Sequence, residues 1–204
     1  MFLHMPTLKK WMKQSWNAGN LIVGNLYDGL IIECGIFHVW LDAAAVPNKV
    51  KGAIMELTGE LPEADRVFQA GKEGNQYEIP WKERWNIPAA ARDGKRYIVT
   101  PVVLADDKYH SFRFLQRAGK PEQVFTVSEM LMNLLDPAEC DYELGEGTPQ
   151  GPFKSDHSDI FYWKTGFCIL GVCRLGISRG LSLRVMDALK EIDFEGDYSG
   201  LEDA

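Results

Sequence analysis

DGLIIECGIFHVWLDAAAVPNKVKGAIMEL, residues 28–57, has the same pattern as DIFYWKTGFCILGVCRLGISRGLSLRVMDA, residues 159–188. Each stretch holds an apolar run, a glycine, a second apolar run, a small-residue loop and a segment with helical spacing. When the two are aligned, Gly35 meets Gly166 and Val39 meets Leu170. The pattern predicts a β-hairpin followed by a helix, used twice. Because identities are few, two unrelated hairpin-plus-helix pieces of one core are the alternative.

The rest of the chain supplies more strands than helices. Helical spacing predicts a helix from Thr7 to about Asn17, and Lys9, Lys10 and Lys13 make it basic. Strands are expected at residues 21–27 and 76–81, a hairpin at 96–104 and 109–116, a helix at 127–135 and a long loop at 143–158. Short turns join most neighbours, so we expect an α+β fold: a mainly antiparallel sheet with helices packed on one face.

Length and composition fit one soluble domain. We expect a single α+β domain over residues 1–193, with possible halves 1–94 and 95–193, and an acidic flexible tail over 194–204. The net charge of −7 argues against non-specific nucleic-acid binding. The four cysteines show no C-x-x-C spacing, and we expect Cys34 and Cys168 to act as buried apolar residues. No signal peptide or membrane-length apolar run is visible, which predicts a cytoplasmic protein without membrane contact.

Two catalytic patterns occur, and both are incomplete. Ser178 lies in a G-x-S-x-G pattern between a predicted strand and a helix, the setting of a nucleophile elbow, but no histidine follows it in the chain. Asp156, His157 and Asp159 bring two carboxylates near an imidazole, yet no second cluster with metal-ligand spacing accompanies them. Phosphate-binding glycine motifs are absent. We therefore expect no cofactor and no resident metal, and a small hydrolase stays an alternative.

Aromatic and basic residues in the middle of the chain predict binding surfaces. Trp81, Arg84 and Trp85 lie between two prolines, and Trp and Arg are enriched at interaction hot spots. The alternative is that each Trp covers the edge of the core. Tyr109, Arg113 and Arg117 share one face of a predicted strand and could stack on single-stranded bases or contact an acidic protein.

No motif in the sequence identifies a family, so function is inferred partly by elimination. The sequence favours a non-catalytic cytoplasmic binding protein, an adaptor or inhibitor that acts through protein–protein contacts. An accessory protein of a phage or mobile element would fit this description. A nucleic-acid-associated protein that uses the basic central region, residues 82–120, is the second hypothesis. The oligomeric state is open, because a doubled hairpin could pair within one chain or leave an edge for a dimer.

Overall fold

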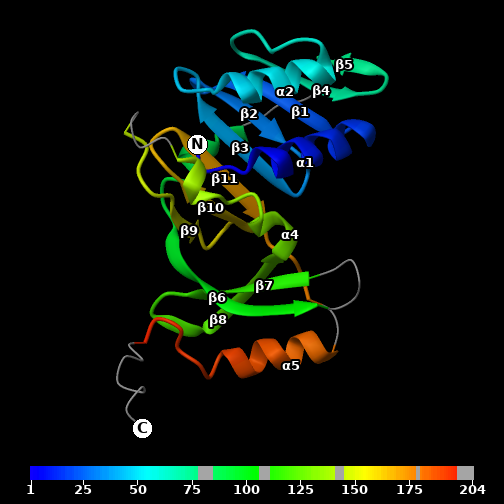
Figure 1. The fold of residues 1–204 in the computed structure, drawn as a ribbon. Coiled ribbons are helices and arrows are strands. Elements are labelled where there is room, and N and C mark those ends of the chain that lie inside the picture. Colours follow the sequence, from blue (N-terminus) through cyan, green and yellow to red (C-terminus); the bar gives the residue numbers. More distant parts are fainter. Residues whose placement is uncertain (78–84, 106–110, 141–144, 178–179, 197–204) are drawn as a thin grey trace.

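The computed structural model describes residues 1–77, 85–105, 111–140, 145–177 and 180–196. Its strands form one 11-stranded sheet in the order β5-β4-β1-β2-β3-β11-β10-β9-β6-β7-β8, and every neighbouring pair in these residues is antiparallel (Figure 1). The predicted α+β class is therefore confirmed.

The elements follow one another along the chain as hairpins and meanders separated by helices. The helices are α1 (Met5–Asn17), α2 (Asn48–Thr58), α3 (Ile87–Ala90), α4 (Glu129–Met132) and α5 (Gly180–Leu189), with a 3-10 turn at Pro137–Glu139. The strands are β1 (Leu21–Leu26), β2 (Gly29–Glu33), β3 (Phe37–Asp42), β4 (Arg66–Gly71), β5 (Gly74–Gln76), β6 (Lys95–Ala105), β7 (Ser111–Arg117), β8 (Lys120–Ser128), β9 (Gln150–Lys154), β10 (Ile160–Lys164) and β11 (Cys168–Cys173).

The two similar stretches form two hairpins that lie side by side at the centre of the sheet. The sequence alignment places β2 on β10 and β3 on β11 with identical strand bounds. β3 and β11 then pair with each other, and Val39 is the partner of Leu170, the residue it meets in the alignment. This join, the pairing of β3 with β11, is therefore symmetric about Val39 and Leu170. It resembles the two-fold interface of a dimer, but lies within one chain. The helices that follow diverge, since α2 packs beside α1 while α5 packs on β8 at the opposite end (Figure 1).

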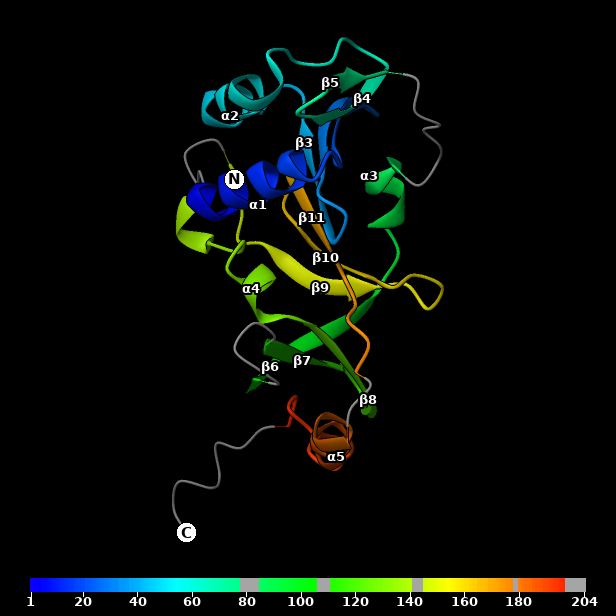
Figure 2. The ribbon, with the colours of Figure 1, turned by 90° about the vertical axis from the view of Figure 1, so that its right-hand side faces the viewer.

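The helices cover both faces of the sheet, and this detail differs from the expected single face. α1 and α2 pack on the main hydrophobic core, which also contains Leu115 of β7. α3 packs on the other face against Trp40 (Figure 2), and α5 covers Phe114, the strand neighbour of Leu115. Because successive strand residues point to opposite faces, α5 lies on the side of the sheet away from α1.

Three strands were missing from the sequence-based prediction, each for a local reason. β4 lies in residues 60–74, where no periodicity stands out, and β9 contains Gly151 and Pro152, so it resembles a loop. β8 begins with polar residues and extends to Ser128, through the start of the expected helix at 127, because it pairs with β7 along this length. In each case pairing with a neighbouring strand outweighs local propensity. Of the expected strand at 76–81, residue 76 ends β5 and residues 78–84 lie outside the described parts.

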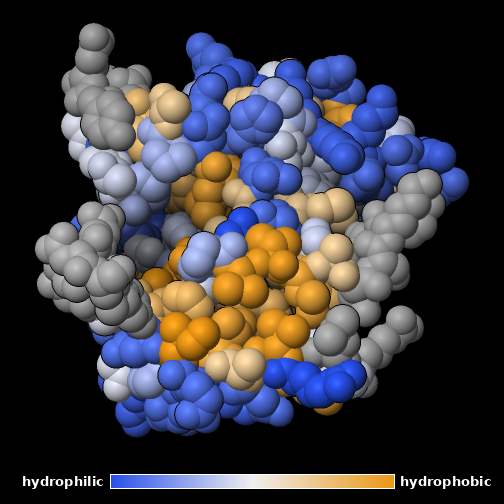
Figure 3. All heavy atoms as spheres, turned by 60° about the horizontal axis from the view of Figure 1, so that its bottom comes forward, coloured by the Kyte–Doolittle hydropathy of each residue, from blue (hydrophilic) through white to orange (hydrophobic). Residues whose placement is uncertain are grey.

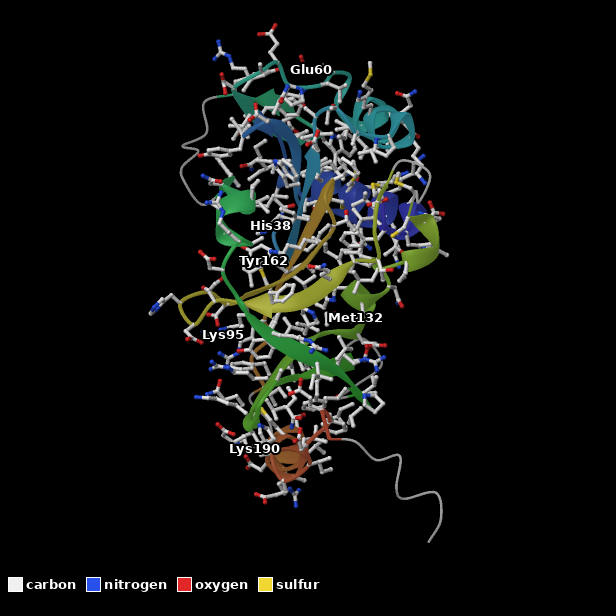
Figure 4. The ribbon with its side chains drawn as sticks, turned by 90° about the vertical axis from the view of Figure 1, so that its left-hand side faces the viewer. His38, Glu60, Lys95, Met132, Tyr162 and Lys190 are labelled. Atoms are coloured by element: carbon white, nitrogen blue, oxygen red, sulfur yellow. The ribbon has the colours of Figure 1, made fainter. Side chains whose placement is uncertain are left out.

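A close contact between β3 and β11 explains why residue 171 is a glycine. Gly171 of β11 pairs with His38 of β3, and a Cβ at position 171 would lie 2.2 Å from Nε2 of His38. The His38 ring is buried beside Tyr162, with ring centroids 5.6 Å apart (Figure 4). Burial raises the pKa of Tyr162 to about 12, so its phenol is neutral. His38 is therefore a buried residue of the sheet.

Candidate functional site

Strand β6 carries the least protected apolar surface of the sheet. Its residues from Tyr97 to Ala105 read YIVTPVVLA, without a charged side chain. β7 pairs with one edge of β6 along its length, but β9 pairs with the other edge only at Lys95 and Arg96. Within the described chain, the outer edge of residues 97–105 therefore has no partner strand. Such an edge offers backbone hydrogen-bonding groups to another chain.

A buried threonine holds an irregular segment in the middle of β6. The register with β7 shifts between Val99 and Val103. The hydroxyl of Thr100 donates to the carbonyl of Phe114 at 3.0 Å and accepts from the backbone N–H of Val102 at 3.3 Å. Thr100 is fully buried, so these bonds form away from water. These two bonds stabilise the irregular segment of β6, which is a β-bulge.

Two valines of β6, Val99 and Val103, form what we call the β6 surface; they are 37% and 42% exposed. They lie on the face of the sheet that Arg113 and Leu115 share, whereas the half-buried Val102 and Leu104 pack on the opposite face, toward α5. The end of the molecule that holds α5 presents a broad hydrophobic area to the solvent (Figure 3). Contiguous apolar areas on a folded monomer often mark interaction sites. Pro101 lies in the middle of the patch and has no N–H, which limits uncontrolled strand pairing at this edge.

The predicted arginines lie next to this surface, but their charges are already engaged. Nε and Nη2 of Arg113 donate to the carboxylate of Glu129 in α4 at 2.7 and 2.5 Å. Nη1 of Arg113 donates to the carbonyl of Thr100 at 3.1 Å. Nη1 of Arg117 donates to Oε1 of Gln123 at 2.8 Å. Leu115, between the two arginines, is fully buried. Both arginines are half-buried, and their role in binding stays a prediction.

Trp85 belongs to the core rather than to the surface. It is 2% exposed and packs with Ile87 and Trp40 in the cluster beneath α3. Its indole N–H donates to the carboxylate of Glu33, which satisfies the polar edge of the buried ring. This position corresponds to the alternative in which the tryptophan covers the edge of the core. Trp81, Arg84 and Tyr109 lie outside the described residues, and their predicted roles stay predictions.

The acidic pair around His157 forms ion pairs with arginines. Asp156 lies 3.6 Å from Nη1 of Arg117, and Asp159 lies 3.4 Å from Nη1 of Arg174. His157 is exposed and lines an open pocket of about 430 Å³ together with Asp156. The carboxylates therefore neutralise basic groups, and no hydrogen bond to His157 is present in the described residues. Ser178 lies outside them, so the hydrolase hypothesis stays a prediction.

A buried lysine lies beneath this acidic pair. Nζ of Lys154 donates to the carbonyl of Ser155 at 3.0 Å and lies 5.1 Å from the ring centroid of Phe125. Burial lowers the pKa of Lys154, although the nearby Asp159 partly opposes this shift. The ammonium is held by a carbonyl and an aromatic ring, which is a structural arrangement.

The cysteines and acidic side chains do not form a metal centre in the described parts of the chain. All four cysteines are free, and Cys34 and Cys168 are buried as expected for apolar residues. Burial raises the pKa of Cys34 to about 12, so its thiol is unreactive near neutral pH. Among the described residues, no helix has the length and apolar character needed to cross a bilayer.

The sequence-based prediction missed the β6 surface as a site, although it identified the strand. The available signal was a run of nine uncharged residues, because a strand with one solvated face normally alternates apolar with polar residues. Comparison of the chain with protein-family models, with curated proteins and with solved structures gave no match.

Proposed function

We propose that the protein is a non-catalytic binding protein that acts in the cytoplasm through protein–protein contacts at the β6 surface. The observation that carries this proposal is the uncharged, unpaired outer edge of β6 with Val99 and Val103 exposed beside it. A partner protein would cover these side chains and remove apolar area from water. Backbone groups on the same edge can hydrogen-bond to an extended segment of the partner.

The engaged charges beside β6 favour this proposal over nucleic-acid binding. Arg113 pairs with the carboxylate of Glu129 and Arg117 lies 3.6 Å from that of Asp156, so both positive charges already have a carboxylate partner and are less available to a phosphate backbone. A protein partner that contributes apolar side chains does not need them. An adaptor or an inhibitor, including one from a phage or mobile element, would use such a surface.

The test compares two lysine substitutions at similarly exposed apolar positions. Val103→Lys places a charge on the β6 surface, while Met55→Lys places the same charge on α2, where Met55 is 49% exposed. Each tagged variant is used to capture proteins from a lysate of the source cells, and captured proteins are quantified by mass spectrometry. We expect a protein captured by the wild type and by Met55→Lys, and depleted about tenfold by Val103→Lys. Equal capture by both variants would refute the proposed site.

A further inference from the structure

A second surface lies between α1 and α2, at the end of the molecule opposite to β6 (Figures 1 and 2). A groove of about 290 Å³ separates the two helices. Its α1 side is formed by Lys9, Lys13 and Trp16, which recur at helical spacing on one stripe of the helix. Its α2 side is formed by Ala53, Glu56 and Leu57.

The floor of this groove is apolar and its α1 rim is basic. Trp16 and Leu57 are half-buried, with their remaining surface open to solvent, and Ala53 is buried between them and the core. Lys9 and Lys13 are exposed, and neither forms an ion pair with any described residue. Helix α1 contains no acidic residue, although the whole chain carries a net charge of −7. The positive charge of this rim is therefore opposite in sign to the net charge of the chain.

We infer that this groove binds an acidic, amphipathic segment of a partner protein. Carboxylates of the segment would contact Lys9 and Lys13, and an apolar side chain would enter between Trp16 and Leu57. This is the helix-in-groove mode of recognition, with charge complementarity that selects the partner. Glu56 on the opposite rim limits the acidic charge that the groove accepts and disfavours a polyanion such as nucleic acid.

The probe is a fluorescein-labelled peptide of about twelve residues, built from glutamate and leucine in helical spacing, and binding is measured by fluorescence anisotropy. We expect Lys9→Glu and Lys13→Glu each to weaken binding about fivefold. Lys10→Glu is the matched control, because Lys10 is exposed on the same helix but does not line the groove. It should leave the affinity within about twofold of the wild type.

Glu56→Gln should change the affinity for the peptide in the opposite direction. Removal of this charge should tighten binding of the acidic peptide, a result that mere damage to the groove would not produce. Absence of binding, or equal weakening by Lys9→Glu and Lys10→Glu, would overturn the inference. Tighter binding of a single-stranded oligonucleotide of equal charge would also overturn it. Val103→Lys should bind the peptide normally, so failure at the groove and failure at the β6 surface are distinguishable.

Discussion

Gly171→Ala perturbs the join between the two hairpins at its tightest point. The added Cβ would lie 2.2 Å from Nε2 and 2.6 Å from Cδ2 of His38, and 2.9 Å from Cε1 of Tyr162. Both rings are buried, so they cannot swing into solvent to make room. Overpacking of this kind costs about 2 kcal/mol. For a chain of this length the melting temperature should fall by about 6 °C.

Urea unfolding followed by circular dichroism measures this loss directly. Gly166→Ala is the control, since it adds the same methyl group in the β10–β11 turn, where nothing lies within 4 Å. It should change the free energy of unfolding by no more than about 0.5 kcal/mol. In a His38→Ala background, Gly171→Ala should cost much less, because the colliding ring is gone. Wild-type stability of the single variant Gly171→Ala would refute the proposed packing of β3 on β11.

Three further predictions concern buried and half-buried groups. Trp85→Ala should cost about 4 kcal/mol of unfolding free energy in urea titrations, because it empties a core position and removes the donor to Glu33; a loss of partner binding at unchanged stability would contradict this role. Burial raises the pKa of Cys34 from 9.0 to about 12, so the unfolded thiol ionises first and stability should fall above pH 9. We measure the free energy of unfolding in urea at neutral and alkaline pH. Above pH 9, Cys34→Ala should make its decrease with pH smaller by about 1 kcal/mol per pH unit. An unchanged dependence on pH would contradict the raised pKa. A double-mutant cycle of Arg113→Ala and Glu129→Ala should give a coupling of about 1 kcal/mol, discounted for partial exposure, whereas additive losses would mean that the pair contributes nothing.

The sequence was sufficient for the two central hairpins, which the apolar runs around Gly35 and Gly166 predict. It left open whether these hairpins pair within one chain, and the structure shows that they do, with Val39 opposite Leu170. The composition of β9 could not reveal its pairing, because Gly151 and Pro152 are typical of loops and only the neighbouring strands make it part of the sheet.

The candidate site was harder to predict than the fold. A run of residue types does not show which strand edge stays open, since this depends on where β9 stops pairing with β6. Arg113 looks like a free binding residue in the sequence, because its partner Glu129 belongs to a helix that begins only after β8 ends. Trp85 looks exposed beside charged neighbours, but the core beneath α3 buries it.

Site-specific photocrosslinking from position 103 tests the binding proposal most directly. A benzoylphenylalanine replaces Val103 in one variant and Met55 in a control variant, and each is irradiated in a lysate of the source cells. Both positions are apolar and well exposed, so chance collisions should label them equally. We expect a discrete adduct with a partner protein from position 103 that position 55 does not give. No adduct from position 103, or the same adducts from both positions, would contradict the β6 surface as the binding site.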